Sequence, residues 1–111
     1  MARLVTRGRF TRDYVKALLA SPEDREPAVR KLIEAVGGKV LSFYFTTGES
    51  DFLLVTEADE GEAIIAALMA AASAGTIADL TTSRAWTGKE FKAIAEKGSK
   101  AAKAYRAPGK R

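Results

Sequence analysis

Hydrophobic and polar residues alternate along four segments of the chain, as they do in β-strands that bury one face. These segments are residues 3–10, 39–47, 51–57 and 76–86. Apolar residues at steps of three and four, the spacing of amphipathic helices, are found at residues 11–36, 63–74 and from 87 onward. The resulting order, β-α-β-β-α-β followed by a C-terminal helix, is that of a ferredoxin-like α+β domain.

Capping residues mark where the helices begin and end. Thr11 is a candidate N-cap for the first helix, and Thr87-x-x-Glu90 is a capping box for the last. A second helix has two candidate starts, either Ser21-Pro22, a capping serine followed by proline, or Pro27. Both starts stay open, and Gly37 supplies a left-handed stop for this helix.

The strands are expected to form one four-stranded antiparallel sheet in the order 4-1-3-2, with the helices on one face. A short connection containing Gly48 favours a hairpin between the second and third strands. The third strand is apolar almost throughout, as in an interior strand covered on both faces. Apolar residues that the helices leave on the other face are Val5, Tyr44, Leu53 and Val55. We expect a second copy of the chain to pack there, sheet against sheet.

Strict alternation along a strand also assigns each side chain to a face of the sheet. In the second strand it places Leu41, Phe43 and Phe45 together, with Val40 and Tyr44 on the opposite face. This assignment assumes a regular strand without a bulge.

The chain has 111 residues, enough for one domain, and contains no cysteine and no histidine. Without cysteine it has no disulfide framework, no thiolate nucleophile and no thiolate metal site. Without histidine it lacks the commonest general acid-base group and transition-metal ligand, so histidine-bound haem is excluded. We therefore expect no metal centre and no cofactor.

The formal net charge of +4 is concentrated at the C-terminal end. Residues 1–96 contain 12 Lys and Arg against 14 Asp and Glu, which predicts a mildly acidic domain. Residues 97–111 contain cations and no acid, and they continue the last helix as far as Pro108-Gly109. This basic end could bind nucleic acid or an acidic partner, but we favour a solvated, frayed helix end. Its cations are Lys97, Lys100, Lys103, Arg106, Lys110 and Arg111.

Several stretches of the chain resemble a known family. They are Gly37-Gly38-Lys39-Val40, Ser42-Phe43-Tyr44-Phe45-Thr46, Gly48-Glu49-x-Asp51-Phe52 and Thr82-x-Arg84-Ala85-Trp86-Thr87. The chain is similar to the GYD domain family, small bacterial proteins named after a Gly-Tyr-Asp signature. The resemblance covers residues 3–95 and implies a ferredoxin-like fold of the dimeric α+β barrel type, without an established activity. Ser50 stands where the signature has tyrosine, so a role for a phenol there does not carry over.

Glu49 and Asp51 flank Ser50 in the predicted hairpin. As paired carboxylates they could bind a cation or move a proton. The alternative is turn chemistry, in which glycine adopts a positive φ and the polar side chains bond the backbone. We favour the turn, because two carboxylates without further oxygen ligands are a weak metal signal.

Arg7, Arg9 and Arg84 form a candidate anion site. Arg7 and Arg9 share a strand face, and the 4-1-3-2 order makes the fourth strand their neighbour, so Arg84 could join them. The other residues of such a pocket between subunits would be Tyr44, Ser42 and Thr82. Arginines suit a carboxylate or phosphate ligand. The alternative, which we favour, is that they pair with the acidic residues Glu57, Asp51 or Asp79.

Tyr44 and Trp86 are large aromatic residues at sheet positions. A small planar ligand could stack on them, although packing in the core or in an interface is the alternative that we favour. The candidate ligand-binding residues are therefore Arg7, Arg9, Tyr44, Glu49, Asp51, Arg84 and Trp86.

The function that we predict is a non-catalytic homo-oligomeric module that holds a small anionic or aromatic ligand between subunits. One alternative is a cofactor-independent enzyme that resembles dimeric α+β barrel monooxygenases, and another is nucleic-acid association through the basic end. The longest apolar run, residues 63–72, is half the length of a membrane span. Residues 1–8 carry two arginines in place of a signal peptide. We therefore expect no membrane partner and a cytoplasmic location.

Overall fold

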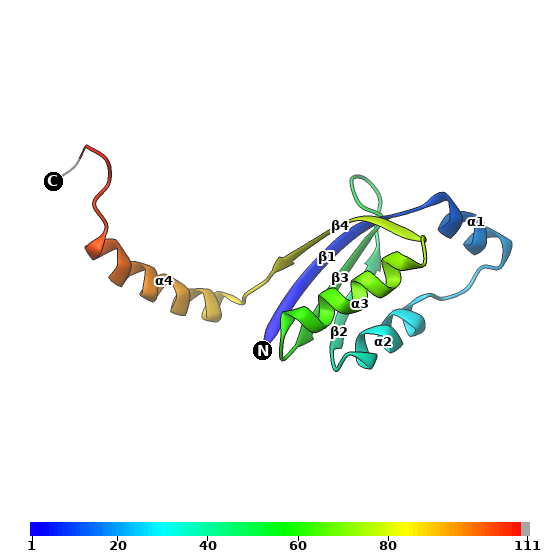
Figure 1. Ribbon diagram of the computed structural model, residues 1–111, viewed down its shortest axis with the longest axis horizontal. Helices are drawn as coiled ribbons and strands as arrows, with labels where there is room; N and C mark the ends of the chain where they lie inside the picture. Colours follow the sequence, from blue (N-terminus) through cyan, green and yellow to red (C-terminus); the bar gives the residue numbers. More distant parts are fainter. Residues whose placement is uncertain (110–111) are drawn as a thin grey trace.

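The computed structural model describes residues 1–109, which form a four-stranded sheet with helices on one face and at its ends (Figure 1). The elements are β1 (Ala2–Phe10), α1 (Arg12–Ala20), α2 (Glu26–Ala35), β2 (Lys39–Phe45), β3 (Phe52–Ala58), α3 (Gly61–Ser73), β4 (Ile77–Arg84) and α4 (Gly88–Ala104). Every strand expected from the alternation is present, and so is the C-terminal helix. The predicted α+β class is confirmed.

The sheet is antiparallel throughout and has the strand order β2-β3-β1-β4. This is the predicted 4-1-3-2 order, read from the opposite edge. Helices α2 and α3 pack against the same face of the sheet (Figure 1). Within the described chain no helix lies on the other face, which we call the open face.

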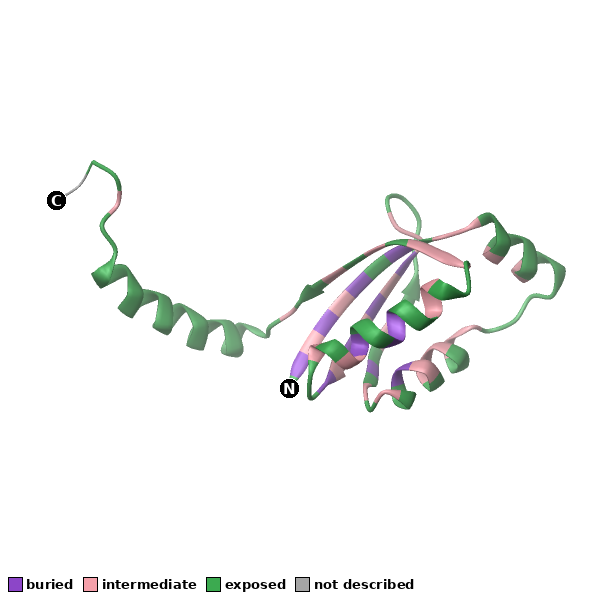
Figure 2. Cartoon of the chain, in the orientation of Figure 1, coloured by how far each residue is buried: buried purple, intermediate pink, exposed green. Residues whose placement is uncertain are grey.

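The core lies between the sheet and the two helices α2 and α3. Ile33 and Ile64 are fully buried in it, and every second side chain of β1 and β3 joins them (Figure 2). The buried apolar cluster consists of Leu4, Ile33, Val40, Phe52, Leu54, Ala58, Ile64, Ala67 and Leu68. Alternate burial follows from strand geometry, which turns successive side chains to opposite faces of a sheet.

Local capping determines where α1 and α2 begin. The hydroxyl of Thr11 accepts a hydrogen bond from the Tyr14 N–H, so the predicted N-cap of α1 is confirmed. Ser21 does not start a helix, because its N–H bonds the Ala17 carbonyl and thereby ends α1. Of the two candidate starts for α2, the one at Pro27 is correct, since Pro27 lies in the first turn of that helix.

Two β-bulges change the faces assigned to individual side chains. In β2 the register with β3 shifts between Val40 and Ser42, which makes Leu41 the extra residue. Val40 is therefore buried with Phe43 in the core, and the predicted pairing of Leu41 with Phe43 is wrong. A second shift between β1 and β4 involves Asp79, whose φ is 52°. Beyond each extra residue, side chains that strict alternation would place on one face of the sheet lie on the other.

Helix α4 leads away from the sheet and the other helices (Figure 1), and the molecule including α4 measures 66 × 31 × 22 Å. None of its 17 residues is buried. Its predicted capping box is confirmed: the Glu90 N–H donates to the Thr87 hydroxyl, and the Glu90 carboxylate accepts from the Thr87 N–H. The helix ends at Ala104, earlier than predicted, and Tyr105 is already extended. No helix of residues 1–109 combines the length and apolarity needed to cross a lipid bilayer.

Candidate functional site

The open face carries the apolar residues predicted to meet a second copy of the chain. Val5 pairs with Val55 and Tyr44 pairs with Leu53, which puts all four side chains on this face, as predicted. Tyr44 is 62% exposed, and the other three are half-buried. Arg7 pairs with Leu53 from the other side and shares the same face. The open face is therefore apolar along β3 and basic along part of β1.

Arg84 does not lie with Arg7 and Arg9. In the register of β1 and β4 it stands opposite Leu4, on the helix-covered side of the sheet. Thr82 lies on that side too, where its hydroxyl is 3.0 Å from a threonine hydroxyl of β1. The predicted grouping of the three arginines with Thr82 is wrong, because the register between two strands decides which of their faces coincide.

Arg7 and Arg9 form no ion pair with the acidic side chains of residues 1–109. Arg9 instead donates from Nη1 to the main-chain carbonyl of Glu49 at 2.9 Å. Glu57, one of their predicted partners, lies 3.8 Å from Nη2 of Arg3, a residue that the sequence did not single out. Arg7 and Arg9 therefore keep charges that no carboxylate of the described chain neutralises.

A polar cluster at the base of α4 contains Arg84 and Trp86. The Arg84 guanidinium lies 5.4 Å from the centre of the Trp86 ring. Beside it, Arg3 donates from Nη1 to the Glu90 carboxylate at 2.8 Å. Hydrogen bonds from the Thr87 backbone and from Arg3 lower the pKa of Glu90 to about 2. These contacts orient the start of α4, and ligand stacking on Trp86 stays a prediction.

Asp51 attaches the hairpin to the end of β1. Its Oδ2 accepts a hydrogen bond from the Phe10 N–H at 2.8 Å. Gly48 adopts a φ of 93°, and the Thr46 hydroxyl donates to the Ser50 carbonyl at 2.7 Å. In the part of the chain that the structure describes, no three acidic side chains gather closely enough to hold a metal ion. These contacts support the turn interpretation of the hairpin.

Replacing Asp51 with alanine is expected to lower the free energy of unfolding by about 1–3 kcal/mol, because the half-buried Phe10 N–H loses its carboxylate partner. Glu49→Ala is the matched control. Its cost should stay below about 0.5 kcal/mol, since the contact of Glu49 with Arg9 uses a carbonyl that alanine retains. Urea unfolding followed by circular dichroism measures both variants, and equal losses would contradict a structural role for Asp51.

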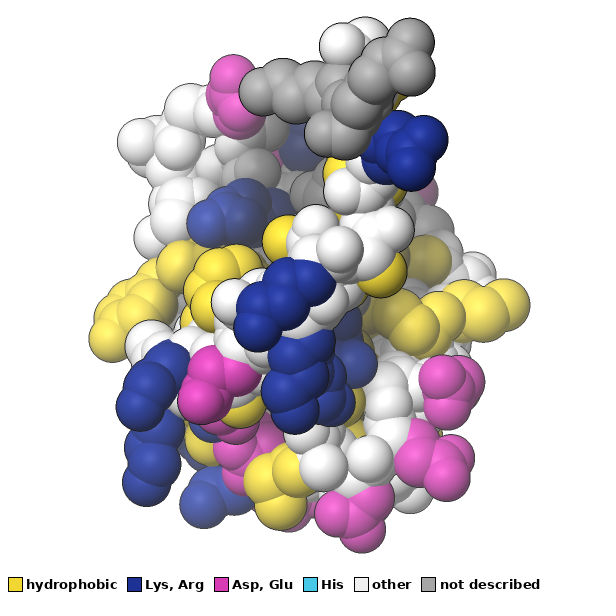
Figure 3. Space-filling view, turned by 90° about the vertical axis from the view of Figure 1, so that its left-hand side faces the viewer, with side chains coloured by type: hydrophobic (Ala, Val, Ile, Leu, Met, Phe, Trp, Pro, Cys, Tyr) yellow, Lys and Arg dark blue, Asp and Glu magenta, His cyan; other side chains and the backbone are white. Residues whose placement is uncertain are grey.

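The basic end of the chain is exposed. Figure 3 views the molecule from the α4 end, where Lys and Arg side chains gather among apolar ones. Of the predicted cations, Lys97, Lys100 and Lys103 lie on α4 and Arg106 follows it. Lys110 and Arg111 lie outside the described residues. Their binding to nucleic acid or an acidic partner stays a prediction.

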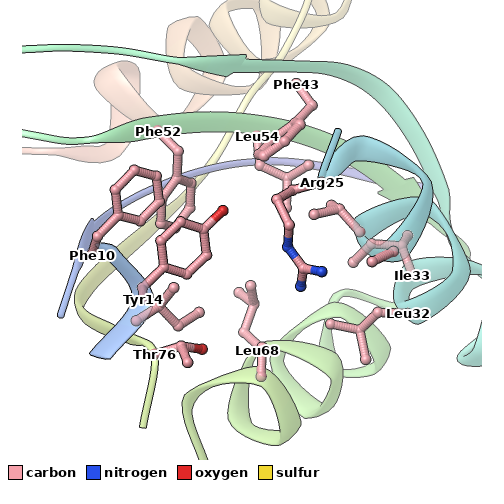
Figure 4. A pocket seen from close by; sticks show the side chains of 14 residues that line it. Phe10, Tyr14, Arg25, Leu32, Ile33, Phe43, Phe52, Leu54, Leu68 and Thr76 are labelled. Atoms are coloured by element: carbon pink, nitrogen blue, oxygen red, sulfur yellow. The ribbon is translucent and has the colours of Figure 1, made fainter. Parts of the chain in front are cut away.

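A cavity of about 120 Å³ lies between the sheet and the helices (Figure 4). It is lined by Phe10, Tyr14, Arg25, Ala28, Val29, Leu32, Ile33, Phe43, Phe52, Leu54, Leu68, Ala71, Thr76 and Ile77. These residues come from all four strands, from α1 to α3 and from the connections between them. All are apolar except Tyr14, Arg25 and Thr76, so the cavity suits an apolar molecule.

The three polar residues stand at the mouth of the cavity. A second depression of about 260 Å³ on the α1 side shares Tyr14, Arg25 and Thr76 with it. The Tyr14 ring stacks on Phe10 with centroids 4.1 Å apart and planes within 5°. Arg25 donates from Nη1 to Glu23 at 2.8 Å. That bond raises the pKa of Arg25 against the opposing effect of burial, and the Tyr14 hydroxyl raises it further.

Sequence reasoning did not identify this cavity, because its lining is drawn from segments between Phe10 and Ile77 that meet only in the folded sheet and helix layers. The sequence did contain one signal of this region, a gathering of aromatic residues. Phe43 and Phe52 recur at inward positions of neighbouring strands, and Tyr14 follows Phe10 four residues later in the chain. Such a gathering of aromatic residues predicts a core, and only the arrangement of α1 and α2 leaves a space inside it.

A model of the GYD domain matches residues 4–95 of the chain. No curated protein and no solved structure matches the chain. The matched span runs from β1 into the first half of α4, so the cavity and the open face both lie within it.

Proposed function

The chain belongs to the GYD domain family, and from this premise we propose that it is a non-catalytic binding module. Protomers associate through the open faces of their sheets, and each holds a small, largely apolar molecule in the cavity between its sheet and its helices. The observation that carries the proposal is the apolar cavity with polar groups confined to its mouth. The ligand then lies inside each protomer rather than between subunits.

The size and chemistry of the cavity support binding. Protein interiors are packed as densely as organic crystals, so the apolar side chains that line this space lack the packing partners that a ligand would supply. An apolar cavity of about 150 Å³ accepts benzene, and this one measures about 120 Å³. Its lining contains no carboxylate, and its hydroxyl groups, Tyr14 and Thr76, have no neighbouring base in the lining to activate them. This chemistry favours binding over catalysis.

The open face supports self-association. Leu53 and Val55 belong to an interior strand, and no element of residues 1–109 covers their side of it. Apolar patches of this kind mark interaction surfaces, and pairing the same face across a two-fold axis produces a closed dimer. Arg7, Arg9 and Tyr44 would lie in or beside that interface, where the arginines need acidic partners because an unpaired buried charge is costly.

Toluene is expected to bind the cavity, and Ala71→Phe should weaken that binding at least about tenfold by filling the space with a ring. The matched control is Ala70→Phe, which adds the same ring at an exposed position of α3. Titration followed by methyl NMR of the lining leucines and isoleucines measures both affinity and location. Toluene binding that Ala71→Phe leaves unchanged, or no binding at all, would refute the proposed function.

A further inference from the structure

Arg25 is the charged residue of the cavity lining, among thirteen uncharged neighbours. Figure 4 shows its guanidinium turned toward the space between the sheet and α3, beside the Tyr14 ring. A guanidinium placed at an apolar cavity is costly unless it has a partner. Nη1 of Arg25 donates one bond to Oε1 of Glu23 at 2.8 Å, and the Arg25 side chain stays 36% exposed.

The Glu23 contact leaves much of the guanidinium available. Arginine carries five N–H donors in a planar fork, and the ion pair with Glu23 uses Nη1 alone. Arg25 is also the N-cap residue of α2, and no side-chain cap bond is formed there. The first N–H of the helix, that of Glu26, already donates to the Asp24 carboxylate at 3.0 Å, so the donors that remain for an anionic partner are those of the guanidinium.

The side chains that line the cavity indicate the chemistry of the uncharged part of the ligand. Phe10, Phe43 and Phe52 approach from the sheet, and Leu32 and Leu68 approach from the helices. The Phe10 ring already stacks on Tyr14 and lies 6.0 Å from the Phe52 ring, so flat surfaces line one side. A volume of about 120 Å³ is close to that of a cavity that holds one aromatic ring.

We propose that the ligand is an aromatic carboxylate of about the size of benzoate, with its ring among the phenylalanine and leucine side chains and its carboxylate on Arg25. The inference rests on the proposed function, since it assigns the chemical class of the molecule that the cavity holds. Bidentate pairing of a carboxylate with the guanidinium fork orients the ring inward. The Tyr14 hydroxyl stands at the same mouth and supplies a further donor.

The test compares benzoate with toluene at pH 7 in the wild-type chain, Arg25→Met and Arg12→Met. Arg12 is an exposed residue of α1 outside the lining, so its variant makes the same charge change away from the cavity. Wild type and Arg12→Met are expected to bind benzoate at least about tenfold more tightly than toluene. Arg25→Met should lower the ratio of benzoate to toluene affinity at least about tenfold. Glu23→Gln, which frees Nη1, should tighten benzoate a few-fold.

Methyl NMR of Ile33 and Leu68 reports whether benzoate sits in the cavity or on the basic end of the chain. Equal benzoate affinity in wild type and Arg25→Met, or shifts confined to α4, would overturn the inference while leaving the cavity function intact if toluene still binds. Absence of binding by either compound to the wild type would refute the proposed function together with this inference.

Discussion

A lysine in place of Val55 is expected to convert the associated protein into monomers. Val55 lies opposite Val5 on the open face of an interior strand, so face-to-face packing would bury the new ammonium without a partner. The dissociation constant should rise at least about 100-fold, which corresponds to about 2.7 kcal/mol. Sedimentation equilibrium at micromolar concentration measures the change in mass.

The matched control for Val55→Lys is Ile65→Lys. Ile65 is an apolar residue that is 42% exposed on α3, on the other side of the sheet, and its variant should associate like the wild type. Far-UV circular dichroism establishes that both variants fold. A wild-type chain that is monomeric at micromolar concentration would refute self-association through the open face, and so would a Val55→Lys variant with the wild-type mass.

Replacing Leu68 with alanine is expected to lower the free energy of unfolding by about 2–5 kcal/mol and to change the size of the ligand accepted. Leu68 is 6% exposed and belongs both to the core cluster and to the cavity wall. Leu68→Ala removes an isopropyl group and joins new space to the cavity, so naphthoate, which has a second ring, should gain affinity relative to benzoate. Urea unfolding and ligand titration measure the two effects.

The neighbouring residue provides the control. Met69 is 69% exposed, and Met69→Ala should change the free energy of unfolding by less than about 0.5 kcal/mol and leave the ratio of naphthoate to benzoate affinity as it is. If Leu68→Ala destabilises the chain without altering that ratio, the space beside Leu68 is not the ligand site. A Leu68→Ala variant with the same free energy of unfolding as the wild type would contradict the place of Leu68 in the core.

Much of the fold could be predicted because its signals are local. The alternation in β1 put Arg7 and Arg9 on one face of the strand, and in the structure both are exposed there while Leu4 is buried on the other face. Thr11 and the Thr87 capping box set two helix starts through bonds that span three residues. Helix ends are harder, since α4 stops at Ala104 where nothing in the described chain packs against it.

The errors have a common origin in register. An extra residue at Leu41 brings Val40 to the core side. The side chains of Val40 and Leu41 carry no signal from which this bulge could be predicted. Arg84 lies away from Arg7 because the pairing of β1 with β4 sets Arg84 opposite Leu4. Alternation orders the residues within a strand, whereas hydrogen bonding between strands decides which residues stand side by side.

Spacing along the chain was enough to establish the order of elements, the antiparallel sheet and the apolar character of the open face, because each depends on residues a few positions apart. The ion pair of Arg3 with Glu90 joins the start of β1 to the first turn of α4. The cavity joins side chains from Phe10 to Ile77, and the place of Arg25 at its mouth depends on how α1 and α2 pack beside the sheet. Only the tertiary structure decided these features, since they arise where distant segments meet, and the chemistry of the candidate site lies there.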